Sequence, residues 1–127
     1  MVTVRIEGGM EYQVRWVSGM IALDALEEAY NKQYFSGPFT YSIQYYGRSV
    51  GYLVNMLNET YDSFASKHEP YYFWEFMVNN EAAPSGIDNT LIEDGDVLSF
   101  SYVTYTAKIH AQTTLQSKYK MKKMLVV

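Results

Sequence analysis

Apolar and polar residues alternate along most of this chain, and that pattern restricts it to a fold built mainly from β-strands. The alternation runs through residues 2–6 and again through residues 12–16, on either side of Gly8-Gly9. A period of two is typical of a strand with one buried face. Two such runs joined by a glycine turn predict a β-hairpin at the start of the chain.

One segment departs from this period and predicts a single amphipathic helix. Ala22, Ala25, Leu26 and Ala29 recur at helical spacing, with acidic residues on the opposite side. Gly37-Pro38 lies beyond the expected end of the helix, as is typical of a helix terminus.

Four further runs predict strands, and together they define the expected fold class. These runs are residues 39–45, 51–57, 71–79 and 97–106. The second also fits a helical spacing, but Gly51 and Asn55 weaken a helix, so we predict a strand there. One helix against a mixed sheet with hairpins indicates an α+β fold, a single β-grasp-like domain, and 127 residues suffice for one such domain.

The segments between these runs are predicted to be loops and turns. Residues 58–70 read as a polar loop, and an irregular connection passes through Pro84 and Gly86. Asp94-Gly95 is a common hairpin signal. We therefore expect Gly95 to adopt a positive φ in a turn between the last two strands of the domain.

Two motifs in the second half of the chain resemble a known family. One is the strand Tyr-Tyr-Phe-Trp-Glu-Phe-Met-Val-Asn-Asn at residues 71–80, and the other is the run from Glu93 to Tyr102, which follows Gly86-Ile87. With residues 2–6 and 18–29, they are similar to the carboxy-terminal domain of transcobalamin and intrinsic factor. That domain also occurs in many bacterial surface proteins. The resemblance covers residues 1–107 and implies a fold and an exported protein more than an activity.

The same resemblance implies a ligand, although this chain departs from the family at a key position. In the vitamin carriers the domain covers one face of cobalamin, and a larger helical domain covers the other. The family's segment Ser-Trp-Gly-Leu is matched by Ser49, Val50, Gly51 and Tyr52, so a valine replaces the tryptophan. Without the helical domain, this domain covers only one face of the ligand, and the complex loses the buried area on which affinity depends. We therefore expect no cofactor, and keep a cobalamin-type corrinoid or a glycan as the alternative ligand.

Aromatic residues supply the candidate ligand surface. The candidate ligand-binding residues are Ser49, Gly51, Tyr52, Tyr72 and Trp74. Trp74 also fits the core, which is the reading we prefer. The chain has 13 tyrosines, whose apolar rings and polar tips suit contact with a glycan, ligand or protein. An aromatic-rich β core explains them as well.

Charge divides the chain into an acidic body and a basic tail. Residues 1–107 contain all 14 acidic side chains and five basic ones, a net charge of −9, whereas residues 108–127 contain five lysines and no acid, a net charge of +5. Opposite charges attract the tail to the body of the same or a neighbouring molecule. The acidic body and the absence of arginine from the tail disfavour nucleic acid and anionic membrane as partners.

The tail continues the strand period beyond the domain, and we interpret it as an interaction strand. Alternation runs from residue 103 to residue 115 and again through residues 118–122, before an apolar end. The candidate assembly residues are Lys118, Tyr119, Lys120, Met121, Met124, Leu125, Val126 and Val127. A strand of this kind can add to the sheet of an adjacent copy, and a head-to-tail contact produces an oligomer or a fibre.

The sequence carries no pattern of an enzyme or of a metal site. Nucleotide-binding glycine loops and nucleophile motifs are absent, and there is no cysteine. His68 and His110 lack the spacing of zinc ligands. The acidic residues between Asp88 and Asp96 lack the spacing of a calcium loop and fit a solvated turn. We therefore expect a non-enzymatic structural or interaction module.

The expected location is extracellular or on the cell surface. Asn58-Glu59-Thr60 fits the acceptor pattern for N-glycosylation at Asn58. No apolar run is long enough to span a membrane, and the start of the sequence lacks the apolar core of a signal peptide. The family resemblance favours an exported protein.

Overall fold

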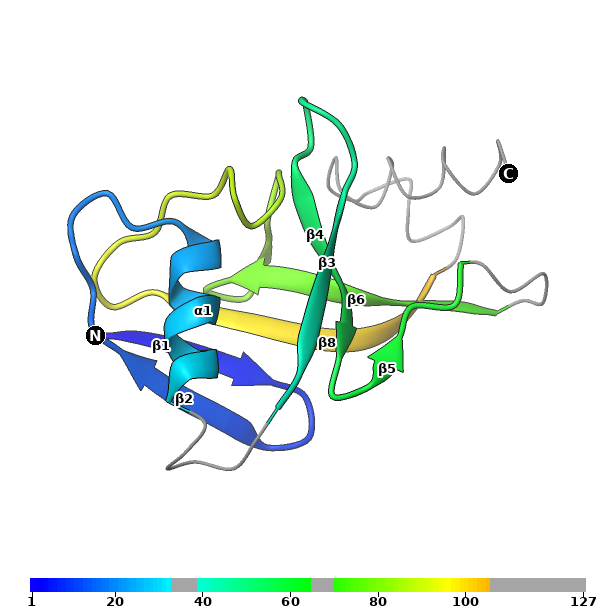
Figure 1. Cartoon of the computed structure of the whole chain (residues 1–127), viewed down its shortest axis with the longest axis horizontal. Coiled ribbons are helices and arrows are strands. Elements are labelled where there is room, and N and C mark those ends of the chain that lie inside the picture. Colours follow the sequence, from blue (N-terminus) through cyan, green and yellow to red (C-terminus); the bar gives the residue numbers. More distant parts are fainter. Residues whose placement is uncertain (33–38, 65–69, 106–127) are drawn as a thin grey trace.

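Two β-sheets and one helix make up the part of the chain that the computed structural model describes, which is residues 1–32, 39–64 and 70–105. The helix and the smaller sheet lie over the same face of the larger sheet (Figure 1). This arrangement confirms the predicted α+β, β-grasp-like domain. The predicted tail strand, residues 108–127, and both histidines lie outside the described residues.

The larger sheet has five strands and is mixed. Its order is β2 (Met10–Val14), β1 (Val2–Ile6), β8 (Val97–Tyr105), β6 (Tyr71–Val78) and β7 (Glu81–Ala82). β1 runs parallel to β8, and the other neighbours are antiparallel. The predicted hairpin across Gly8-Gly9 is confirmed as the β1–β2 pair.

The smaller sheet has three antiparallel strands, and its outer strands are β3 and β5. Its order is β3 (Tyr41–Tyr45), β4 (Tyr52–Leu57) and β5 (Thr60–Tyr61). The extended reading of residues 51–57 is therefore confirmed. The prediction of a plain loop over residues 58–70 is wrong at β5, which is two residues long and too short to show a period of its own.

The helix α1 (Ala22–Asn31) forms the core with the strands beneath it. Its fully buried residues are Ala22, Ala25, Leu26 and Ala29, the residues of the predicted apolar stripe. Small alanine side chains let a helix approach a sheet closely, and α1 packs on β1 and β2. The pairing of Val4 with Leu98 and of Ile6 with Phe100 carries the same core into β8.

The turn prediction at Asp94-Gly95 is half right. Gly95 has a φ of +95°, as expected, and its N–H donates to the carbonyl of Met1 at 3.0 Å. This turn, however, leads into β8 beside β1 and does not close a hairpin between the last two strands. The hairpin turn that follows β6 is Asn79-Asn80, whose φ angles of 53° and 67° are the left-handed values that asparagine tolerates.

Candidate interaction site

The β3–β4 hairpin projects from the body, and a loop holds its inner side (Figure 1). The carbonyl of Val50 accepts three hydrogen bonds from this loop: from the Gly86 N–H at 2.8 Å, the Ser85 hydroxyl at 3.0 Å and the Asn89 side-chain amide at 3.1 Å. Three donors on one carbonyl fix the position of the hairpin tip on the body.

The same loop covers the outer edge of β4 at Tyr52. The Tyr52 N–H donates to the Asp88 carboxylate at 2.7 Å, and its carbonyl accepts from the Ile87 N–H at 2.9 Å. The chains approach so closely that a Cβ on Gly86 would lie 2.7 Å from the Val50 carbonyl oxygen and closer still to that of Tyr52. Only glycine fits this position without a shift of the backbone.

The candidate ligand residues divide between two places. Ser49, Gly51 and Tyr52 belong to the hairpin, where Ser49 is exposed and Gly51 packs against Asp88 and Asn89. The Tyr52 ring is 36% exposed and lies 5.0 Å from the ring of Tyr45, which is 54% exposed. Sequence reasoning missed Tyr45 as a functional candidate, although its place in the alternating run 39–45 was the available signal.

Trp74 and Tyr72 lie on β6 and form a separate aromatic group. Trp74 is only 4% exposed, and its Nε1–H donates to the carbonyl of Thr60 at 2.8 Å. It therefore belongs to the core, as preferred, and the alternative assignment of Trp74 to an exposed stacking surface is wrong. Tyr72 is 37% exposed, but its ring stacks on Tyr102 at 5.4 Å.

Most strand edges in the described part of the chain are closed. At the edge of β6, the Tyr72 carbonyl accepts from Ser63 N–H at 3.0 Å, and the Phe76 carbonyl accepts from Ala83 N–H at 3.1 Å. At the edge of β2, the Lys32 ammonium donates to the carbonyl of Gln13 at 2.9 Å. A charge on an edge strand opposes pairing with another chain.

The edge of β3 is the longest open edge among the described strands. The Tyr46 N–H donates to the carbonyl of Gly51 on the β4 side at 2.9 Å, so the odd-numbered residues of β3 direct their main-chain groups away from β4. Among the described residues, none donates or accepts a hydrogen bond at these outward groups of Tyr41, Ile43 or Tyr45. The strand has the sequence Tyr-Ser-Ile-Gln-Tyr, without a charge or a proline.

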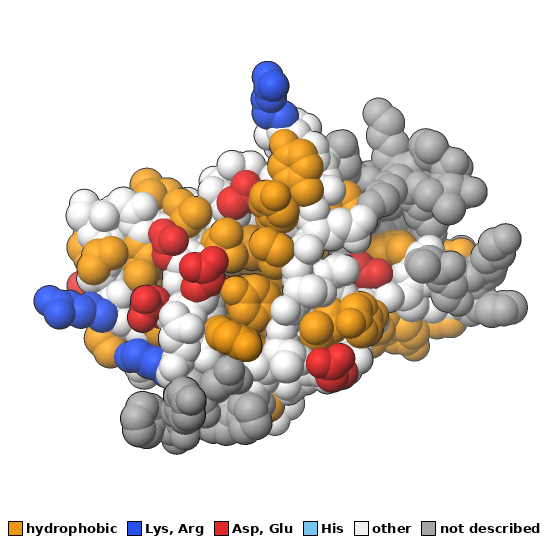
Figure 2. Space-filling model, in the orientation of Figure 1, with side chains coloured by type: hydrophobic (Ala, Val, Ile, Leu, Met, Phe, Trp, Pro, Cys, Tyr) orange, Lys and Arg blue, Asp and Glu red, His pale blue; other side chains and the backbone are white. Residues whose placement is uncertain are grey.

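Hydrophobic side chains extend from this edge to the helix. We call this surface the α1–β3 strip. Its members are Leu23, Tyr30, Tyr41, Ile43, Tyr45 and Tyr52. Figure 2 shows hydrophobic side chains exposed between α1 and the hairpin, with acidic side chains beside them. The rings of Tyr30 and Tyr41 meet edge to face at 5.5 Å.

Glu27 adds a negative charge to the strip. Leu23, Glu27 and Tyr30 are spaced to lie on one side of α1, and Glu27 is exposed. Burial raises the pKa of the Tyr41 hydroxyl, and the nearby Glu27 carboxylate raises it further. In the parts of the chain that are described, no cation pairs with Glu27.

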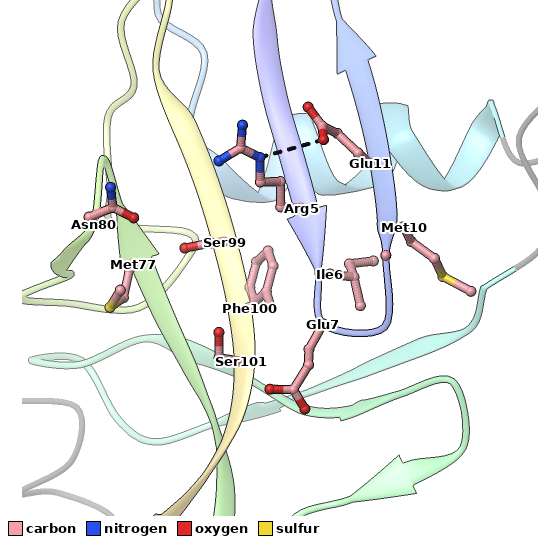
Figure 3. Close-up of a pocket in the computed structure, with 11 residues that line it drawn as sticks. Arg5, Ile6, Glu7, Met10, Glu11, Met77, Asn80, Ser99, Phe100 and Ser101 are labelled. Carbon is pink, nitrogen blue, oxygen red and sulfur yellow. Dashed lines mark ion pairs between the residues drawn. The ribbon is translucent and has the colours of Figure 1, made fainter.

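A shallow depression on the opposite face of the larger sheet has a mixed lining that is more apolar than polar and carries one cation and two carboxylates. Its volume is about 380 Å³, and Figure 3 shows the hydroxyls of Ser99 and Ser101 on its floor. Arg5 and Glu11 form an ion pair there, 3.6 Å apart, and Glu7 has no ion-pair partner among the described residues. Within the described ranges, no three His, Cys, Asp or Glu side chains gather as metal ligands, and no helix is long and apolar enough to span a membrane.

Comparison with known proteins places this α+β domain in a family. The family model described as "Domain of unknown function (DUF4430)" matches residues 19–104, so the chain belongs to that family. A search of the curated proteins found no match. Neither result names the transcobalamin and intrinsic factor domain, and that finer resemblance stays a prediction.

Several solved structures are similar in fold. One of them is a protein of Ruminococcus gnavus ATCC 29149, described as a "putative metal binding protein", with a TM-score of 0.52 and 15% sequence identity. The match covers 83% of this chain and 95% of that one. At this level of identity the similarity concerns the fold alone.

The contact between Gly86 and the hairpin gives a test of the fixed tip. We expect Gly86→Ala to destabilise the domain by about 2–3 kcal/mol, because the added methyl group overlaps two carbonyl oxygens. Ser85→Ala, which removes one hydrogen bond to Val50, is the matched control and should cost about 1 kcal/mol. Urea denaturation measures both. Equal effects of the two variants would contradict the close approach.

Proposed function

We propose that this protein is a non-enzymatic extracellular module that self-assembles when the C-terminal strand of one copy adds to β3 of the next. The observation that carries the proposal is the edge of β3, which has neither a charge nor a main-chain partner among the described residues. Added strands gain affinity from main-chain hydrogen bonds, and their alternate side chains set the register. β3 offers both features that an added strand needs: main-chain groups that point away from β4, and an apolar surface beside them.

The proposed donor is the basic tail, residues 108–127. Its alternating segments supply one apolar and one polar face, and its charge of +5 opposes the −9 of the body. Because donor and acceptor are different surfaces of the same chain, the contact does not close on itself, and assembly gives an oligomer or a fibre. Long-range attraction speeds the encounter and weakens with salt.

The extracellular location is part of the same proposal. It rests on the family resemblance and on the sequon at Asn58. Asn58 is exposed in the turn between β4 and β5, where a glycan would meet solvent. Treatment with an N-glycosidase, followed by mass measurement of the secreted protein, tests for modification at this residue.

Removal of the tail tests the proposed assembly. We expect a chain of residues 1–107 to be a folded monomer at concentrations where the full chain forms larger species, because the donor strand is missing. Light scattering coupled to gel filtration measures the mass, and circular dichroism checks the fold. A full-length protein that stays monomeric at high concentration, or a truncated one that still assembles, would refute the proposal.

A second candidate function is supported by the exposed pair Tyr45 and Tyr52. Two tyrosine rings 5.0 Å apart on a fixed hairpin can stack on a flat ligand or sugar. Tyr52 is also the residue that matches the ligand-facing segment of the resembled family. On this alternative, the protein binds a corrinoid or a glycan.

Titration with a corrinoid separates the two functions. We expect no binding of cobalamin or cobinamide tighter than about micromolar, because a valine replaces the family's tryptophan and the Tyr45–Tyr52 surface is small. Isothermal titration calorimetry is the measurement, with Tyr52→Ala as the control. A nanomolar constant that this substitution weakens would make ligand binding the better account.

A further inference from the structure

The charge of the helix α1 on its exposed side is not neutralised within the described part of the chain. Glu27 and Glu28 are both exposed and have no ion-pair partner there. Lys32, the nearest cation along the sequence, instead donates to the main chain of β2. Glu27 differs from Glu28 because it lies close enough to Tyr41 to raise the pKa of that hydroxyl.

Glu27 is therefore a carboxylate without an ion-pair partner among the described residues, beside a mostly aromatic surface that ends at an open strand edge. An apolar strand could pack on such a surface, but a carboxylate without a partner would then lose part of its hydration. A strand that brings a cation to Glu27 avoids this cost. The chemistry of the site thus favours an extended segment with apolar side chains on one face and cations on the other.

We propose that Glu27 pairs with a lysine of the segment Lys118–Lys122 from a second copy of the chain, and so determines which strand docks on β3. This inference rests on the proposed function. In the segment Lys-Tyr-Lys-Met-Lys, the side chains of Tyr119 and Met121 share one face and the three lysines share the other. Tyr119 and Met121 pack on the α1–β3 strip, and a lysine stem reaches sideways to Glu27.

The direction of β8 favours a second copy over the same copy as the donor. β8 begins beside β1 and runs away from α1, and its last described residue, Tyr105, pairs with Tyr71 (Figure 1). The chain therefore leaves the described domain at the end of the sheet that is remote from the helix. A neighbouring molecule can present its tail to the strip without crossing the sheet.

Charge reversal at Glu27 tests the pairing. In the full chain, Glu27→Lys should weaken self-association by about tenfold, because it places a like charge against the donor lysines. Glu81→Lys, an exposed change of the same size on β7, is the matched control and should alter the association constant less than about threefold. Lysine is as good a helix former as glutamate, so the helix is retained. Sedimentation velocity measures the association, and circular dichroism confirms the fold.

Rescue makes the test specific. Glu27→Lys is combined in turn with Lys118→Glu, Lys120→Glu and Lys122→Glu, and one of these pairs should return the association constant to within about threefold of the original. The proposal is overturned if Glu27→Lys and Glu81→Lys weaken assembly equally, or if none of the three combinations restores it. Assembly that survives removal of residues 108–127 overturns the proposed function as well, which separates that failure from a failure at Glu27 alone.

Discussion

The hydrogen bonds between the loop 85–90 and the β3–β4 hairpin determine which surface of this domain is left available. They satisfy the main-chain groups of Val50 and Tyr52 and cover β4 on the side away from β3. Within the described residues, the outer edges of the smaller sheet are then β3 and the two-residue β5, and β3 is the longer of the two. Since a main-chain group deprived of water and of a partner is costly, an open edge is a surface that accepts another strand or stays in solvent.

The contrast between β2 and β3 supports a role for the β3 edge in pairing with another strand. Both are outer strands, but β2 contains Glu11 and has the ammonium of Lys32 on its outward carbonyl, whereas β3 has no such protection. Natural sheets commonly place charges on edges that should not pair. The sequence protects the β2 edge with charge and leaves the β3 edge open, uncharged and rich in tyrosine. This difference is consistent with a β3 edge that pairs with another strand.

The fold was largely predictable because its signals are local. Alternation located the main strands, and the spacing of Ala22, Ala25, Leu26 and Ala29 located the helix. The prediction errors lie where contacts between residues far apart in the sequence determine the local structure. β5 is too short to carry a period, and the Asp94-Gly95 turn joins β8 to the chain start because of a parallel pairing that no local pattern encodes.

The candidate site was harder to predict for the same reason. The residues Tyr52, Tyr72 and Trp74 look alike in the sequence, but the register buries Trp74 and separates Tyr72 from the hairpin. The closed outer edge of β4 depends on a loop more than thirty residues away. The absence of charge from residues 41–45 was visible in the sequence, yet only the strand order shows that these residues form an outer edge.

Hydrogen exchange at the outward amides of β3 tests the central claim most directly. The amides of Tyr41, Ile43 and Tyr45 should exchange rapidly in the chain of residues 1–107 and at least about tenfold more slowly in the assembled full-length protein, because an added strand binds them. The β2 amides of Glu11 and Gln13 should exchange at the same rate in both. Exchange at β3 that assembly leaves unchanged, or protection that appears at β2 instead, would contradict the account.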